Sequence, residues 1–252
     1  MKLIDLVSVL DAHAPFSSAL SFDNAGILCG DPQREIRKVL LSLDITYEVI
    51  SEARAMGADL ILTHHPALFS AQKKFSPTDR VYLLIENGIA AVAAHTNLDM
   101  ARGGVNDVLA SAVGLTEISP WSGDDPSFVS RCGALPEATP LQEFAARVKV
   151  ALNANCVRFA DGGKPVNKVA LCGGSGGDMW ASLVGTEFDT LLTSDVKYHQ
   201  FLEASQAGIN LVDAGHFATE NLVLPVLESW LREADASLEI SYSSFCDPVS
   251  TI

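Results

Sequence analysis

Two adjacent histidines follow a short apolar run in the stretch Ala58-Asp59-Leu60-Ile61-Leu62-Thr63-His64-His65-Pro66. The run is typical of a buried strand, and Pro66 ends it because proline has no backbone N–H to pair. Side chains alternate in direction along a strand, so the two imidazoles are expected to point apart and to suit two metal ions better than one. The alternative is that they are two unrelated polar residues at a loop edge.

Composition restricts the class of protein. The 252 residues suffice for one large or two modest domains, and the net charge of −14 argues against a nucleic-acid backbone or an anionic membrane surface as main partner. No uncharged apolar run approaches the length of a membrane span, and Asp5 interrupts the N-terminal apolar residues, which makes a poor signal peptide. We therefore expect a cytoplasmic protein.

The cysteines show no paired spacing. They are Cys29, Cys132, Cys156, Cys172 and Cys246. Five scattered cysteines without a C-x-x-C motif predict neither a disulfide framework nor a thiolate zinc site.

The first half alternates strands and helices. Helical spacing of apolar residues predicts a helix over 3–13, and short apolar runs predict strands at 27–29, 38–43, 58–62 and 89–94. Helices are expected at 47–56, with Thr46 as cap and Gly57 as stop, and at 79–87. This alternation indicates a largely parallel sheet.

The second half repeats the pattern after a polar break at 120–125, which gives predicted domains of 1–122 and 123–252. Strands are expected at 128–135, 156–160, 168–172, 189–193, 209–212 and 238–242. Helices are expected at 140–152, from about 179, at 197–207, and, as one long helix, from about 218. A glycine-rich loop, Gly173 to Asp178, follows the strand at 168–172.

The two halves can be superposed in sequence. Val39-Leu40-Leu41 matches Val169-Ala170-Leu171, and Asp59 to Thr63 matches Asp189 to Thr193, so that His64-His65 corresponds to Ser194-Asp195. The shared spacing favours an internal repeat over chance similarity between apolar strands. We expect two similar three-layer α/β/α units with largely parallel sheets and a metal site between them.

Two further pairs carry metal-binding chemistry. His95-x-x-x-Asp99 and His216-x-x-x-Glu220 each follow a predicted parallel strand, at the sheet edge where α/β proteins bind ligands. At that spacing each pair shares one helix face, and taken singly it fits a surface hydrogen bond. Together with the His64-His65 strand end, these imidazoles and carboxylates suit zinc, iron, manganese or similar ions.

Six segments spanning nearly the whole chain form a specific combination: Phe22-Asp23-Asn24-Ala25-Gly26, Thr63-His64-His65-Pro66, His95-Thr96-Asn97-Leu98-Asp99, Gly103-Gly104-Val105-Asn106-Asp107, Gly173 to Asp178, and Asp213-Ala214-Gly215-His216-Phe217-Ala218-Thr219-Glu220. With them the sequence resembles the YbgI-like dinuclear-metal proteins, the type 2 GTP cyclohydrolase I homologues. The resemblance implies two divalent metal ions per chain, with ligands His64, His65, Asp99, His216 and Glu220. Longer members insert a domain between the halves, for which this chain has no room.

The resemblance also implies a ring-shaped homohexamer and a metal-dependent hydrolase acting on a small molecule such as a nucleotide or another phosphorylated compound. The alternative is a non-enzymatic metal-binding regulatory or scaffold oligomer. Five protein ligands for two ions leave vacant coordination positions, which favours the hydrolase.

Three features remain open at this point. His95 lies outside the ligand set that the resemblance implies. It is a candidate to act from outside the coordination shell of the metal, or to transfer a proton near metal-bound water. His199 is a candidate acid/base, although it also fits a solvated helix start. The glycines from Gly173 to Gly177 lack the spacing of a nucleotide fingerprint, and they fit either a phosphate approach to the next helix or a tight turn.

Overall fold

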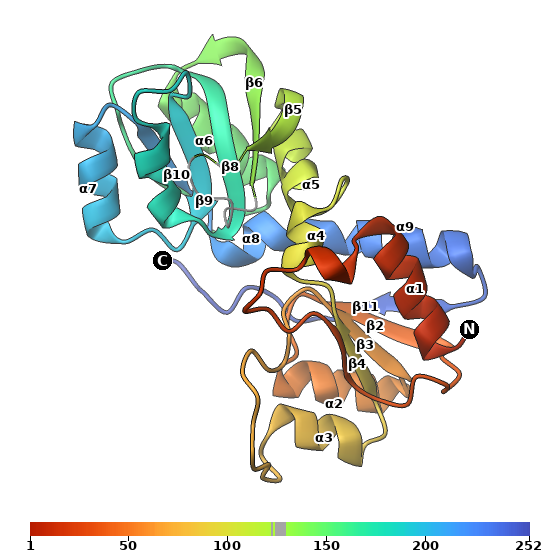
Figure 1. Cartoon of the computed structure of the whole chain (residues 1–252). Helices are drawn as coiled ribbons and strands as arrows, with labels where there is room; N and C mark the ends of the chain where they lie inside the picture. Colours follow the sequence, from red (N-terminus) through yellow and green to blue (C-terminus); the bar gives the residue numbers. More distant parts are fainter. Residues whose placement is uncertain (122, 124–129) are drawn as a thin grey trace. The chain divides into compact units, whose positions relative to one another are not determined.

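The computed structural model describes residues 1–121, 123 and 130–252, and the chain divides into two compact units. Unit 1 comprises Met1–Gly104 and Val223–Cys246, and unit 2 comprises Val105–Leu222 and Asp247–Ile252. Each unit contains one sheet covered by helices (Figure 1).

This division differs from the boundary expected at 122/123. The last helix and strand of the chain return to unit 1, where strand β11 pairs with β2 and covers that edge of the sheet. Residues 105–121 belong to unit 2, because their helix and strand pack against its sheet. Of the polar break at 120–125, residues 122, 124 and 125 lie outside the described residues.

Unit 1 has a five-stranded sheet in the order β1-β4-β3-β2-β11, parallel except for β1. Its strands are β1 (Gly26–Cys29), β2 (Lys38–Ser42), β3 (Leu60–Thr63), β4 (Ala90–Ala93) and β11 (Glu239–Tyr242). Its helices are α1 (Leu3–His13), the 3₁₀ helix η1 (Phe16–Ser18), α2 (Tyr47–Met56), α3 (Arg80–Glu86), α4 (Thr96–Met100) and α9 (Leu224–Ala234).

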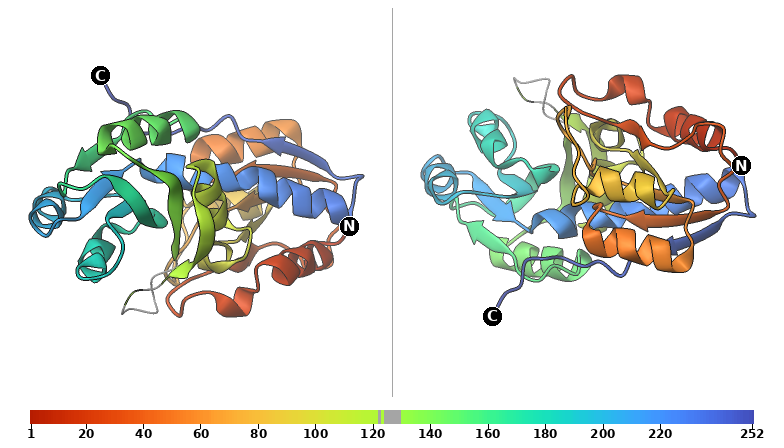
Figure 2. Two further views of the ribbon diagram at one scale, coloured as in Figure 1. Left: turned by 90° about the horizontal axis from the view of Figure 1, so that it is seen from above. Right: turned by 90° about the horizontal axis from the view of Figure 1, so that it is seen from below.

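Helices cover both faces of this sheet. Leu40, Ile61 and Ala91 pack against α2 and α3 on one face, while α1 and α9 lie on the other (Figures 1 and 2). Helix α2 begins and ends as expected: the Thr46 hydroxyl accepts a hydrogen bond from the backbone N–H of Val49, and Gly57 ends the helix with a φ of 67°.

Unit 2 has a six-stranded sheet in the order β5-β6-β8-β9-β10-β7. Its strands are β5 (Thr116–Trp121), β6 (Ser130–Thr139), β7 (Arg158–Ala160), β8 (Val166–Ser175), β9 (Thr190–Ser194) and β10 (Asn210–Asp213). Its helices are α5 (Val105–Ala112), α6 (Leu141–Ala151), the 3₁₀ helix η2 (Gly177–Leu183), α7 (Tyr198–Gln206) and α8 (His216–Glu220), and the 3₁₀ helix η3 (Asn221–Val223) follows at the point where the chain leaves the unit. The neighbouring strands β8, β9 and β10 pair in parallel. The pairs β5–β6 and β6–β8 on one side of them, and β10–β7 on the other, are antiparallel.

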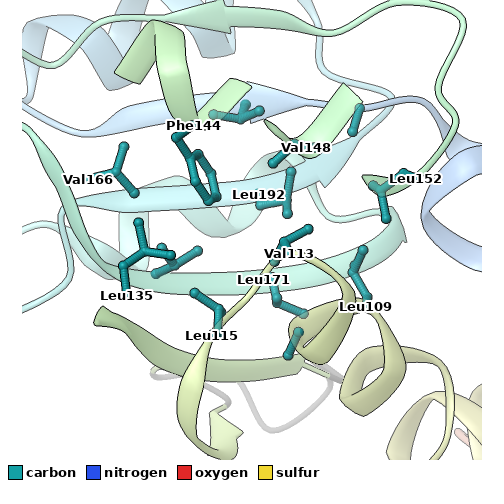
Figure 3. Close-up of a cluster of buried hydrophobic side chains, with 14 of the residues drawn as sticks. Leu109, Val113, Leu115, Leu135, Phe144, Val148, Leu152, Val166, Leu171 and Leu192 are labelled. Carbon is teal, nitrogen blue, oxygen red and sulfur yellow. The ribbon is translucent and has the colours of Figure 1, made fainter. Parts of the chain in front are cut away.

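The core of unit 2 lies on both faces of this sheet. Leu171 and Leu192 pack with Phe144 and Val148 of α6 in the larger cluster (Figure 3). The neighbouring residue Ala170 packs on the opposite face, in a cluster with residues of η2 and α7. Alternation along buried strands thus produces the expected three layers in each unit.

Several expected elements differ in detail. The long helix predicted from about 218 is interrupted between α8 and α9 by η3, because Pro225 cannot supply an intrahelical N–H. The glycine-rich segment is no simple loop, since β8 continues through Gly174 to Ser175, which pairs with Ser194. Helix α5 and strand β5 were not predicted. Both units contain three consecutive parallel strands, and the origin of the units by duplication stays a prediction. Among the helices that the structure describes, none is long and apolar enough to cross a bilayer.

Candidate metal centre

Three imidazoles of unit 1 converge at the ends of β3 and β4, and we call His64, His65 and His95 the histidine cluster. Their ring centroids lie 4.9 to 5.6 Å apart, and their potential ligand atoms all lie within 4.8 Å of one another. The expected divergence of His64 and His65 does not occur, because β3 ends at Thr63 and strand alternation no longer applies beyond it. Imidazole ligands on a common zinc ion have centroids roughly 5 Å apart, so the spacing suits a cation.

Each ring of the histidine cluster is anchored through its Nδ1 atom. The acceptors, each 2.8 Å away, are the carbonyl of Ala94 for His64, Asp44 Oδ1 for His65 and Asp23 Oδ1 for His95. These oxygens can only accept, so the proton is assigned to Nδ1 and Nε2 is the nitrogen able to coordinate an ion. A ligating histidine in a metalloprotein is commonly held in this way.

Asp23 is the most constrained of these acceptors. Its side chain is fully buried, and it accepts hydrogen bonds from His95, from the Thr96 N–H and from the Thr96 hydroxyl. Burial raises the pKa of the Asp23 carboxyl, but these hydrogen bonds outweigh burial and hold the pKa well below its ordinary value. Asp23 and Asp44 were not predicted as site residues, although Asp23 lies in a segment that carries the family resemblance.

Asp99 faces the histidine cluster from α4. It is 7% exposed, and its Oδ1 lies 3.6 Å from His64 Nε2. His95 is the residue before α4, and its Nδ1 atom contacts Asp23, so His95 and Asp99 do not form the simple helix-surface pair considered from the sequence. The structure therefore brings four of the predicted residues of unit 1 together, His95 included.

Unit 2 presents a histidine and a carboxylate on α8. His216 Nε2 lies 3.0 Å from Glu220 Oε2, and His216 Nδ1 lies 2.7 Å from Asp195 Oδ2. Burial lowers the pKa of His216, but Glu220 and Asp195 outweigh it by hydrogen bonding and charge and raise the pKa to about 9. Glu220 is 4% exposed, whereas the His216 side chain is 35% exposed, so the carboxylate is buried and the ring is partly open to solvent.

The glycine-rich segment packs directly against this pair. The backbone N–H groups of Gly173, Gly174 and Gly176 donate to side chains of the protein, namely Asn106, Thr219 and Thr193. These groups are therefore engaged within the fold, which favours the tight turn over a phosphate site. A Cβ atom at Gly174 would overlap Glu220 Oε1 and lie 3.2 Å from His216 Nε2. Glycine is required there to let the backbone approach the carboxylate.

The remaining predicted residues stay apart from these groups. His199 is exposed on α7, and no potential metal-binding group among the described residues includes it. The five cysteines are all reduced thiols, and the same groups contain none of them.

A protein-family model identifies the family of this chain. The model described as Duf34/NIF3 (NGG1p interacting factor 3) matches residues 1–248. The chain belongs to the Duf34/NIF3 family. Among curated Duf34/NIF3 relatives, a GTP cyclohydrolase 1 type 2 homolog of Clostridium perfringens is 34% identical over 96% of each chain. Another of that name, from Streptomyces coelicolor, is 36% identical and covers 87% of this chain and 81% of its own.

Solved structures agree with this assignment. Staphylococcus aureus protein SA1388 superposes with a TM-score of 0.91 at 25% identity, covering 100% of this chain and 99% of its own. Reduced HcgD from Methanocaldococcus jannaschii superposes with a TM-score of 0.84 at 28% identity, covering 97% and 98%. The resemblance inferred from the sequence motifs and the α/β fold are thus confirmed for this Duf34/NIF3 member.

Proposed function

We propose that this Duf34/NIF3 protein is a metal-dependent hydrolase that holds two divalent ions. The proposed ligands are His64, His65, Asp99, His216 and Glu220. One observation carries the proposal: each of the three proposed histidine ligands, His64, His65 and His216, is anchored through Nδ1 by an oxygen acceptor. Such anchoring fixes the tautomer that presents Nε2 to an ion.

The donor set fits borderline divalent ions. It combines imidazole nitrogens with carboxylate oxygens and contains no thiolate, which suits zinc, iron or manganese. The proposed ligands come from both units, His64, His65 and Asp99 from unit 1 and His216 and Glu220 from unit 2, and carboxylates are able to bridge two cations. Bound ions of this kind supply Lewis acidity for hydrolysis. Five ligands leave coordination positions for water and substrate.

The substrate class is proposed from the relatives. Their name, GTP cyclohydrolase 1 type 2 homolog, makes nucleotides the first compounds to test, followed by other phosphorylated small molecules. His95 is the candidate for proton transfer, because its ring belongs to the histidine cluster while the family resemblance leaves it outside the ligand set. His199 is the weaker candidate, since it is exposed on α7.

A second function is a non-enzymatic, metal-binding scaffold or regulator. The observation that favours it is the family description itself, which names an interacting factor. For either function we propose a ring-shaped homohexamer, as the sequence resemblance implies, and a cytoplasmic location, as expected from the sequence composition. A stable monomer in light scattering at micromolar concentration would contradict the assembly.

The test combines metal analysis with a substrate screen. Purified protein is analysed for bound elements, stripped with a chelator, reloaded with the metal found, and screened against nucleotides, phosphoesters and peptides. We expect hydrolysis that depends on reloading and that is lost in Glu220→Ala but kept in Glu203→Ala, a matched change at an exposed glutamate of unit 2. Metal binding without any hydrolysis would favour the scaffold.

A further inference from the structure

Asp195 has a backbone conformation that is uncommon outside glycine. It follows β9 directly and has a φ of 55°, in the left-handed region, where a Cβ atom is disfavoured and glycine is common. Only Glu117 and Asn153 share a positive φ among the non-glycine residues that the structure describes. Strained residues of this kind persist where the surrounding structure holds them, and they often serve a site.

The strained residue carries a specific contact. Its Oδ2 atom accepts a hydrogen bond from His216 Nδ1 at 2.7 Å, and the opposite ring nitrogen, Nε2, lies 3.0 Å from Glu220 Oε2. Asp195 therefore fixes the orientation of the His216 ring through Nδ1, and the opposite side of the ring contacts Glu220 through Nε2. With the proton held on Nδ1, Nε2 is the coordinating nitrogen.

Neighbouring groups hold the turn in place. The next residue, Val196, donates its N–H to Asp213 Oδ2 at 3.1 Å, and its carbonyl accepts from Arg158 Nη2 at 3.0 Å. Arg158 also pairs with Asp213, whose other oxygen accepts the N–H of Gly215 at 3.0 Å. The segment before α8 and the turn after β9 are thus tied to the same carboxylate, which keeps Asp195 opposite His216.

In each unit an aspartate orients a proposed histidine ligand, but the aspartate occupies a different position. In unit 1 the aspartate that orients His65 is Asp44, which lies beyond the neighbouring strand β2. In unit 2 the orienting aspartate occupies the position that the sequence superposition pairs with His65. A position that carries a proposed ligand in one unit therefore carries a ligand-orienting carboxylate in the other.

We propose that Asp195 is a positioning residue that sets the affinity of the His216–Glu220 pair for a divalent ion, through the hydrogen bond to Nδ1. The inference rests on the proposed metal-binding function. Loss of such an outer partner weakens metal affinity by about 10- to 100-fold in known sites. The backbone conformation of Asp195 accompanies this contact, because the residue with a φ of 55° is the one whose carboxylate reaches the ring.

The experiment uses full-length, chelator-stripped protein with Zn²⁺ as the probe, titrated in competition with a chromophoric chelator at constant pH. Asp195→Asn keeps the side-chain shape, an acceptor oxygen and tolerance of the left-handed region, whereas Asp195→Gly removes the side chain. Glu117→Gly is the matched control, because it removes the same charge at the same φ of 55° from β5. Thermal unfolding of each metal-free variant monitors folding.

We expect the affinity of at least one Zn²⁺ binding step to fall about tenfold or more in Asp195→Gly and to a lesser extent in Asp195→Asn, with Glu117→Gly equal to wild type. Co²⁺ absorption spectra should change in the same order. Wild-type affinity in both Asp195 variants would overturn this proposal alone. Wild-type protein that binds no divalent ion would overturn the proposed function and this inference with it. If Asp195→Gly fails to fold, the Asp195→Asn comparison decides.

Discussion

The Nδ1 atom of His95 lies 2.8 Å from Oδ1 of Asp23, and the other oxygen of this buried carboxylate accepts two hydrogen bonds from Thr96. One side chain thus orients the third ring of the histidine cluster and fastens the segment before β1 to the start of α4. Positioning and local stability are therefore coupled at Asp23.

Replacing Asp23 tests this coupling. Asp23→Asn should lower the free energy of unfolding at neutral pH by about 1–3 kcal/mol, because buried hydrogen-bonding groups lose a charged partner. The folded-state pKa of Asp23 is lowered, so its stabilisation is present above the unfolded-state pKa of about 4 and is lost as pH falls further. Thermal unfolding of metal-free protein between pH 7 and pH 3 should therefore show a steeper acid decline for wild type than for the variant. Parallel curves would refute this role.

Gly174→Ala should impair metal binding more than folding. The added Cβ atom would overlap Glu220 Oε1 and displace a proposed ligand. Gly185→Ala is the control, because Gly185 has a φ of 81° and a Cβ atom added there would meet no atom within 4 Å, so only the backbone strain of about 1–2 kcal/mol applies. We expect both variants to unfold at lower temperature and only Gly174→Ala to lose bound metal. Equal metal content in both would count against the close approach to Glu220.

Metal binding at His216 should release a proton. The pKa of His216 is raised to about 9 in the metal-free protein, so at neutral pH an ion must displace the proton from the ring. The apparent affinity for the metal should therefore rise with pH up to about 9. Calorimetry in buffers of different ionisation enthalpy should count the released proton, and His216→Ala should not release it. The stability of the metal-free fold changes with pH in the opposite direction. The raised pKa of His216 stabilises that fold below about pH 6.5, and this stabilisation is lost as pH rises through about 9. Affinity independent of pH would contradict the assignment.

Much of the scaffold could be predicted because it depends on local pattern. The buried strands read as apolar runs, and Thr46 and Gly57 mark the ends of α2 by capping chemistry alone. Strand β11 was predicted as a strand but assigned to the wrong unit, since its pairing with β2 is a long-range contact that no local pattern encodes. A fragment ending near Pro120 would for the same reason lack two elements of unit 1.

The candidate ligands were predictable and their supports were not. Histidine and carboxylate pairs at strand ends are visible in sequence, but Asp44, Asp195 and Asp23 reach their histidines across 21 to 72 residues. The alternation of residues in the sequence also did not predict the direction of the His64 and His65 rings, because that direction depends on β3 ending at Thr63. A carboxylate next to a predicted strand end, such as Asp44 or Asp195, is the signal that could have found two of these supports.

The most direct test of the central claim is metal stoichiometry per chain. Full-length wild type, His64→Ala, His95→Ala, Glu220→Ala and the control Glu203→Ala are purified alike, loaded with one divalent metal, freed of excess and analysed for metal and protein. Loss of Glu220 would leave less negative charge to offset the repulsion between two poorly screened cations. We expect two ions in wild type, Glu203→Ala and His95→Ala, and at most one in Glu220→Ala and His64→Ala. Two ions retained in Glu220→Ala, or a loss in His95→Ala as severe as in His64→Ala, would contradict the ligand assignment.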